Sequence, residues 1–182
     1  MPRLFTGLEV PAPIASRLAS VQGGLPGARW IDPEDFHITL AFAGDISPST
    51  AVEVAEMLGR LDKPSLSLRL MGLETFGSKK PTSIHARVST DPQLAELQAS
   101  HASILRRLGV TVEKRRYQPH VTVARVGRCR PVDIGKFMTR AAFVFTDPFP
   151  VERFVLYSAR DSVGGGPYLV EQTYPLRQEV AA

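Results

Sequence analysis

Cysteine is nearly absent from this chain, because Cys129 is the only one among 182 residues. A single cysteine excludes a disulfide framework and a cysteine-based zinc site. Long apolar segments are lacking as well, since no run approaches the roughly 20 residues that a membrane-spanning helix needs. The first residues lack the apolar stretch of a secretory signal. We therefore expect a globular protein of the cytoplasm that makes no membrane contact, with Cys129 as an ordinary unpaired thiol.

Motifs of cofactor and metal chemistry are also missing. The chain contains no GxGxxG sequence and no P-loop, and its acidic residues are dispersed rather than paired as in a glycosidase or a two-metal nuclease. No carboxylate or cysteine stands at ligand spacing beside the histidines discussed below. The sequence therefore predicts no cofactor and no bound metal ion.

Negative charge is in slight deficit, which leaves a formal net charge of +4. Residues 114–116 read Lys-Arg-Arg, and further arginines stand at Arg125, Arg128 and Arg130, so basic groups flank His120 on both sides. A cationic surface speeds the encounter with polyphosphate ligands. The distribution favours an anionic partner.

Short strands dominate the expected secondary structure. Period-two alternation and turn residues predict strands, and apolar spacing of three to four residues predicts helices. Such a pattern is typical of an α+β fold with antiparallel sheets rather than of a doubly wound parallel sheet. The expected strands cover 2–9, 36–42, 65–73, 83–88, 120–126, 142–145, 153–158 and 168–175, and the expected helices cover 12–21, 48–61 and 92–108.

Two of the four histidines stand in nearly identical five-residue sequence motifs, which we call words. Residues 37–41 read His-Ile-Thr-Leu-Ala, and residues 120–124 read His-Val-Thr-Val-Ala. In a strand, residues two apart point to the same face, so each histidine projects beside its threonine while the aliphatic residues pack behind. An apolar backing of this kind holds a polar pair in place, as a catalytic group requires.

Two such strands facing each other would surround one cavity with two imidazoles and two hydroxyls. Imidazole titrates near neutrality, so one ring can accept a proton while the other donates one. Opening a cyclic phosphodiester needs both a base for water and an acid for the departing oxygen, and threonine hydroxyls can donate hydrogen bonds to the phosphate oxygens.

The other two histidines carry less information. His101 falls among apolar residues of an expected helix, and we interpret it as a packed residue. His85 shares one strand face with Ser83 and Arg87, and that face could line the same cavity or meet solvent.

The two words resemble the paired His-x-Thr-x motifs of the 2H phosphoesterases. Their flanks resemble the bacterial and archaeal RNA 2′,3′-cyclic phosphodiesterases, historically called 2′-5′ RNA ligases. The similarity runs almost from end to end. Supporting words are Arg3-Leu4-Phe5, Trp30-Ile31, Ala41-Phe42-Ala43-Gly44, Phe76-Gly77, Pro119-His120, Ala124-Arg125, Leu156-Tyr157-Ser158 and Gly166-Pro167-Tyr168.

The resemblance implies a single domain over residues 1–182. Its fold would be two pseudo-symmetric lobes, each an antiparallel sheet with helices on the outside, packed intimately around an active-site cleft. The implied enzyme is a metal-independent RNA 2′,3′-cyclic phosphodiesterase that yields a 2′-phosphate. Its partner would be an RNA with a 2′,3′-cyclic phosphate end or a nucleoside cyclic phosphate, and no obligate protein partner is implied.

The same resemblance assigns roles. His37 would be the proton donor to the ribose 3′-oxygen and His120 the proton acceptor from water, whereas the residues alone allow the reverse assignment. Thr39 and Thr122 would hold the phosphate with help from Arg125, although strict alternation aims Arg125 away from the histidine face.

One departure from the family concerns nucleoside stacking. The family often has tryptophan where this chain has His85, so Phe42 or Tyr157 becomes the candidate stacking ring.

Two alternatives stay open at this stage. The same site could form 2′-5′ linkages by reversal of the hydrolytic chemistry, because no nucleotide-activation motif is present. A non-catalytic module could also use the histidines and threonines only to grip an RNA end.

Overall fold

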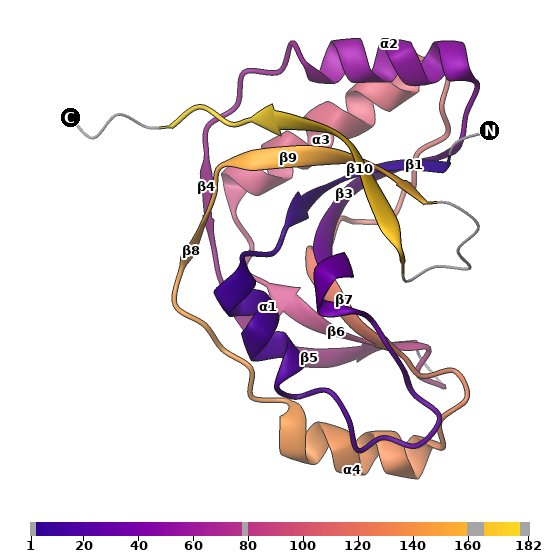
Figure 1. Cartoon of the computed structure of the whole chain (residues 1–182), viewed down its shortest axis with the longest axis vertical. Helices are drawn as coiled ribbons and strands as arrows, with labels where there is room; N and C mark the ends of the chain where they lie inside the picture. Colours follow the sequence, from indigo (N-terminus) through magenta and orange to yellow (C-terminus); the bar gives the residue numbers. More distant parts are fainter. Residues whose placement is uncertain (1–2, 78–79, 160–165, 179–182) are drawn as a thin grey trace.

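The computed structural model describes residues 3–77, 80–159 and 166–178. Within them, eight strands form one large antiparallel sheet and two further strands form a small one (Figure 1). The large sheet contains β1 (Arg3–Glu9), β2 (Arg29–Trp30), β3 (His37–Asp45), β5 (Leu70–Phe76), β6 (Ser83–Val88), β7 (His120–Arg125), β9 (Arg153–Ala159) and β10 (Tyr168–Pro175). The small sheet pairs β4 (Leu66–Leu68) with β8 (Phe149–Val151). The expected α+β class with antiparallel sheets is confirmed.

The large sheet consists of two halves that meet at one residue pair. Its strand order is β10-β9-β1-β3-β7-β6-β5, with β2 beside β7. Between β3 and β7 the register holds a single pair, Ile38 opposite Val121. We call β10, β9, β1 and β3 the first half, and β7, β6, β5 and β2 the second half. The two expected lobes are therefore present, and their sheets are continuous through this narrow join.

Helices cover the two halves and also tie them together. They are α1 (Ala12–Ala19), α2 (Pro48–Leu58), α3 (Pro92–Arg107) and α4 (Pro131–Ala141), with a short 3₁₀ turn η1 (Pro33–Asp35). In Figure 1, α2 and α3 lie at one end of the molecule and α4 at the other, where it contacts β5. Although α3 lies between β6 and β7 in the chain, it packs against β3 of the first half. None of these helices is long and apolar enough to cross a membrane.

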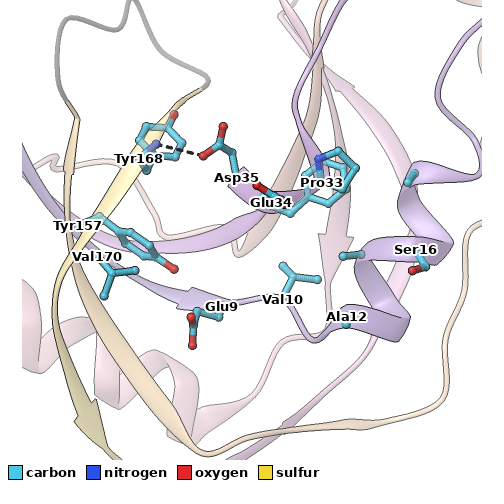
Figure 2. A pocket seen from close by; sticks show the side chains of 13 residues that line it. Glu9, Val10, Ala12, Ser16, Pro33, Glu34, Asp35, Tyr157, Tyr168 and Val170 are labelled. Atoms are coloured by element: carbon cyan, nitrogen blue, oxygen red, sulfur yellow. Dashed lines mark hydrogen bonds between the residues drawn. The ribbon is translucent and has the colours of Figure 1, made fainter.

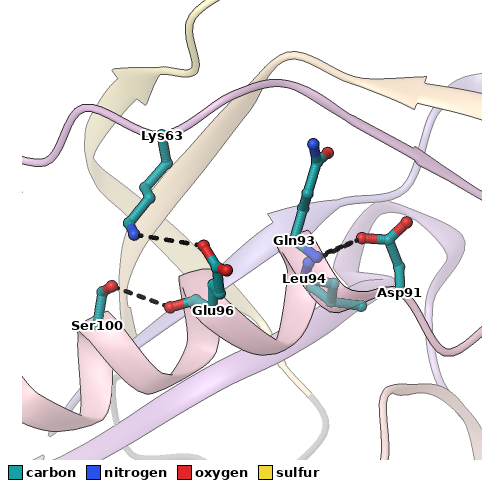
Figure 3. A network of polar contacts seen from close by, with 6 residues as sticks. All are labelled: Lys63, Asp91, Gln93, Leu94, Glu96 and Ser100. Atoms are coloured by element: carbon teal, nitrogen blue, oxygen red, sulfur yellow. Dashed lines mark hydrogen bonds and ion pairs between the residues drawn. The ribbon is translucent and has the colours of Figure 1, made fainter.

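The start of α3 shows how local sequence sets a helix boundary (Figure 3). The Asp91 carboxylate accepts hydrogen bonds from the backbone N–H groups of Gln93 (2.8 Å) and Leu94 (3.0 Å). A cap of this kind stabilises a helix by about 1 kcal/mol. The exposed Lys63–Glu96 ion pair, with its atoms 3.8 Å apart, contributes much less because water screens it.

Three expectations about the elements need correction. Residues 142–145 do not form a strand; only an isolated bridge joins Phe145 to Met71. The expected strand 65–73 is interrupted at Arg69, and its two parts, β4 and β5, join different sheets. Helix α4 was not predicted, although Pro131 at its start and buried Ile134, Phe137 and Ala141 carry a helical signal.

The core lies directly behind the two histidine words. Ile38, Val121 and Val123 have no exposed surface, and Leu40 is 2% exposed. All four belong to one apolar cluster that spans both halves. Burying each such side chain contributes about 1.5–3 kcal/mol, so these apolar residues anchor the strand segments that carry the histidines.

Candidate active site

One cleft of about 760 Å³ brings together the residues singled out from the two words. His37 and Thr39 enter it from β3, and His120 and Thr122 enter it from β7. In both strands the histidine and threonine are partly exposed while the residues between them are buried. The structure therefore places both polar pairs on one face of the sheet, with their apolar neighbours on the other.

The join between the halves sets a diagonal arrangement. Because Ile38 pairs with Val121 in an antiparallel register, His37 lies across from Thr122, and Thr39 lies across from His120. In the strand order, each histidine position thus neighbours the threonine position of the opposite word. A phosphate centred here could meet a ring and a hydroxyl from each half.

A shared backbone contact orients both rings. His37 Nδ1 lies 2.8 Å from the Asp35 carbonyl oxygen, and His120 Nδ1 lies 2.8 Å from the Gln118 carbonyl oxygen. A carbonyl can only accept, so Nδ1 carries the proton in each ring. Nε2 is then the nitrogen that can take up or release a proton, and the two rings present the same reactive atom.

Aromatic rings surround His37. Its ring centroid lies 4.9 Å from that of Phe5, 5.0 Å from that of Tyr168 and 5.7 Å from that of Tyr157. Burial lowers the pKa of His37 below its ordinary value, because the charged ring loses hydration. The backbone bond to Asp35 and the Asp35 carboxylate raise it in part, whereas the nearby charges of His120 and Arg125 lower it further.

A second imidazole lies beside His120. The His85 ring is 4.8 Å from that of His120, and its Nε2 lies 3.0 Å from a carboxylate oxygen of Glu74. Only 5% of His85 is exposed, and it lines the cleft opposite Thr122. Burial lowers the pKa of His85, and the bond to Glu74 offsets part of that effect. Of the strand face left open in the sequence interpretation, Ser83 and His85 therefore line the cleft, whereas Arg87 does not.

His101 is buried, as expected for a packed residue. It has no exposed surface, and its Nδ1 lies 2.8 Å from the Thr6 hydroxyl oxygen. Burial lowers its pKa to about 3. His101 does not line the cleft and takes no part in the site.

Matching irregularities in the two halves bring Phe42 and Arg125 into the cleft. In β1–β3 the pairing skips Leu40, and in β6–β7 it skips Val123, the residue at the same place in the second word. A bulge of this kind breaks strict alternation and re-aims the side chains that follow. Phe42 and Arg125, the sixth residues counted from each histidine, therefore line the cleft. The inference from strict alternation that Arg125 points away was wrong.

The candidate stacking rings differ from one another. Phe42 is 44% exposed at the cleft, with the Arg3 guanidinium 5.3 Å from its ring centre. Tyr157 is 7% exposed, stacks on Phe5 and does not line this cleft, so its ring is not available to a nucleoside there. Phe76, which sequence reasoning missed as a candidate ring, is 47% exposed and lines the cleft beside His85.

Further polar residues complete the cleft wall, and sequence reasoning did not single them out one by one. The Tyr117 hydroxyl donates to the Thr39 carbonyl at 2.9 Å and so ties the segment before β7 to β3. The basic run near residue 115, noted for its position before His120, reaches the cleft. The additional lining residues are Arg3, Gln98, Glu113, Arg115, Arg116, Tyr117 and Gln118.

Cys129 does not line the cleft. Cys129 is buried, and that burial raises the pKa of its thiol, which disfavours the reactive thiolate. In residues 3–77, 80–159 and 166–178, no group of three or more His, Cys, Asp or Glu side chains is arranged to hold a metal ion.

A family model for LigT-like phosphoesterases matches residues 8–85 and again residues 87–168. The chain belongs to this family. The first match contains His37 and the second contains His120, so the family pattern occurs once around each word. The resemblance to the 2H phosphoesterases is confirmed.

Curated relatives of this phosphoesterase carry one common name, RNA 2′,3′-cyclic phosphodiesterase. The protein of Bacillus subtilis is 30% identical over 132 residues, which are 68% of this chain and 71% of the relative. The protein of Geobacillus stearothermophilus is 32% identical over 120 residues, 64% of this chain but only 38% of the relative. The protein of Escherichia coli is 24% identical over 181 residues, 97% of each chain.

Solved structures of the family share the fold. A Thermus thermophilus protein superposes with a TM-score of 0.79 at 22% identity, covering 98% of this chain and all of the other. Escherichia coli LigT in complex with 3′-AMP gives a TM-score of 0.76 at 22% identity with the same coverage. These matches confirm the two-lobed architecture.

Proposed function

We propose that this phosphoesterase hydrolyses RNA and nucleoside 2′,3′-cyclic phosphates to 2′-phosphates, with His37 and His120 as an acid–base pair and without a metal ion. Family membership and the common name of the curated relatives support the activity itself. The observation that carries the mechanism is the arrangement of two Nδ1-anchored imidazoles and two threonines around one cleft.

The proposed reaction is a single displacement at phosphorus. His120 Nε2 takes a proton from water as the water oxygen bonds to phosphorus. The bond from phosphorus to the ribose 3′-oxygen breaks, and His37 Nε2 donates its proton to that oxygen. The hydroxyls of Thr39 and Thr122 donate to the non-bridging oxygens, and Arg125 balances their charge.

The surroundings of His37 constrain when it can act as the acid. Burial lowers its pKa, so the neutral ring is favoured in the free protein near pH 7. A bound cyclic phosphate brings a negative charge to the same cleft, and an adjacent anion favours the imidazolium form. Substrate binding would therefore charge the ring that must release a proton.

The decisive experiment identifies the product in the presence of EDTA. Protein dialysed against EDTA is incubated with a nucleoside 2′,3′-cyclic phosphate and with an RNA bearing that end, and the product is assigned as a 2′- or 3′-phosphate by phosphorus NMR. We expect a 2′-phosphate and undiminished turnover in EDTA. Loss of activity in EDTA would refute the metal-free mechanism, and a 3′-phosphate would refute the choice of leaving oxygen.

The same assay separates the two alternatives. Binding of the cyclic phosphate without any product would indicate a module that only grips RNA ends. Joining of an added 5′-hydroxyl RNA through a 2′-5′ linkage would reveal ligation, in which the 5′-hydroxyl takes the place of water, His120 accepts its proton and His37 protonates the departing 3′-oxygen. We expect this joining to occur only at high concentrations of ends, because water competes for the cyclic phosphate.

A further inference from the structure

Asp35 makes two contacts that converge on His37. Its backbone carbonyl accepts the Nδ1–H of His37, as described above. Its carboxylate Oδ1 accepts the backbone N–H of Tyr168 at 3.0 Å, across 133 residues of sequence (Figure 2). One residue in the η1 turn therefore connects the histidine of β3 to the first residue of β10.

This contact places the Tyr168 ring against His37. The two rings meet edge to face, with centroids 5.0 Å apart and planes at 85°. Tyr168 meets Phe5 in the same way, at 5.0 Å and 77°. The Asp35 carboxylate thus helps to hold the aromatic wall that encloses the His37 ring.

The space around the carboxylate is shaped to receive it. A Cβ atom on Gly166 would lie 1.9 Å from Asp35 Oδ2, closer than two such atoms can approach. Gly166 also has φ +84°, a conformation that favours glycine. Asp35 and Tyr168 form the partition between the catalytic cleft and a neighbouring cavity of about 510 Å³, which Figure 2 shows.

The charges that face His37 come from two sides. The Asp35 carboxylate lies in the turn before β3 and raises the pKa of His37, whereas His120 and Arg125 on β7 lower it. Tyr157 on β9 and Tyr168 on β10 place phenol rings against it. Asp35 therefore opposes the effect of His120 and Arg125 on the pKa of His37.

The second half has no such carboxylate at the equivalent position. The residue two before His120 is Gln118, whose carbonyl makes the same Nδ1 contact but whose side chain is a neutral amide. Positions 35 and 118 thus share the backbone role and differ in charge. The negative charge stands beside the histidine to which the proposed mechanism gives the acid role.

We propose that Asp35 is a positioning residue for His37: its carbonyl and carboxylate fix the ring and its aromatic wall, and its negative charge fits His37 rather than His120 to proton donation. The part of this inference that concerns proton donation rests on the proposed function. The holding of the ring and the effect of the charge on it can be measured without turnover.

The test compares two substitutions of Asp35 with a matched control. Asp35→Asn keeps an oxygen that can accept from Tyr168 but removes the charge, whereas Asp35→Ala removes both. Glu34→Gln removes a charge from the adjacent exposed residue and serves as the control. For each protein, NMR follows the titration of the His37 ring, and kinetics give kcat, KM and the pH profile.

We expect Asp35→Asn to lower the pKa of His37 in the NMR titration. It should also move the alkaline limb of the kcat profile to lower pH, because the acid loses its proton earlier. Asp35→Ala should in addition lower kcat by about tenfold at the optimum with little change in KM, since a misplaced ring loses catalytic alignment. Glu34→Gln should match the unmodified protein in every respect.

The outcomes separate this inference from the proposed function. An unchanged His37 titration in Asp35→Asn would overturn the inference, whatever the activity. A lowered titration with an unmoved alkaline limb would also overturn it, because His37 would then not be the donor. Absence of turnover in the unmodified protein would refute the proposed function, and the NMR titration would still decide whether Asp35 acts on His37.

Discussion

His37 and His120 stand in the same five-residue strand motif, but different residues surround their rings. At the position that pairs with Thr122 the second half has His85, whereas at the position that pairs with Thr39 the first half has Gly7. A Cβ atom on Gly7 would lie 2.9 Å from the Ile38 carbonyl oxygen and 3.4 Å from the Tyr157 ring. Aromatic rings therefore occupy the first half where a hydrogen-bonded imidazole stands in the second.

This contrast shows how a symmetric backbone can support an asymmetric reaction. Acid and base must differ in proton affinity, and that difference comes from what surrounds each ring. His37 is enclosed by aromatic rings and accompanied by a carboxylate, while His120 has His85 and the neutral Gln118 beside it. Substitution of the residues in each half would show whether these differences matter to the chemistry.

The largest effects are expected from removing either imidazole. His37→Ala and His120→Ala should each lower kcat by about 10²–10⁴-fold, the usual contribution of a general acid or base. A substrate with sulfur in place of the bridging 3′-oxygen has a leaving group that needs little protonation. It should restore much of the turnover of His37→Ala and little of that of His120→Ala.

Circular dichroism would verify that both variants are folded. Rescue of His120→Ala instead of His37→Ala would reverse the assignment of acid and base. Full activity of either variant with the ordinary substrate would refute the acid–base pair altogether.

The two threonines should behave alike, in contrast to the histidines. Thr39→Val and Thr122→Val should each lower kcat by about a hundredfold, because each removes one donor to the phosphate in the transition state. Thr→Ser at either position keeps the hydroxyl and should retain most of the activity. Steady-state kinetics on the four variants would measure this, and a loss confined to one threonine would show that the phosphate is bound by one half only.

Acid should destabilise the fold through a buried histidine of α3, the helix that packs against the first half. His101 has a pKa of about 3 in the folded state and near 6.5 when unfolded. The unfolded chain then binds an extra proton below pH 6.5, so this stabilising contribution is complete above that value and declines as the pH falls toward 3. Between pH 7.5 and 5.5 the titration of this histidine lowers the free energy of unfolding by about 1.4 kcal/mol.

Urea unfolding at the two pH values would measure this effect. The pH-dependent loss of unfolding free energy should be smaller by that amount in His101→Leu, and equal losses in both proteins would contradict the prediction.

A single cooperative unfolding transition in urea is also expected if residues 1–182 form one domain, whereas two separate transitions would show lobes that unfold independently.

The smallest effect concerns the imidazole beside His120. His85→Ala removes a ring contact worth about 0.5–1.5 kcal/mol and should lower kcat by about twofold to tenfold. His85→Trp restores a ring against His120 and a ring N–H that can donate to Glu74, so most of the loss should be recovered. Kinetics on both variants would test this, and equal losses would show that the second half needs the imidazole itself.

Much of the site could be predicted because its signal is local. The histidine and threonine of each word lie two residues apart, and the period of a strand alone places them on one face. The same period predicted buried Ile38 and Val121. The bulges at Leu40 and Val123 were not predictable in this way, because they arise from pairing with other strands, and they decide where Phe42 and Arg125 point.

The sequence by itself determined the residues of the candidate site: two imidazole–hydroxyl pairs on apolar-backed strands, with basic residues near one of them. Only the tertiary structure decided how the two pairs differ. Asp35 meets Tyr168 across 133 residues, and His85 meets His120 across a strand pairing. Strand periodicity acts between neighbours in the chain, whereas burial and charge depend on which distant segments the fold brings together.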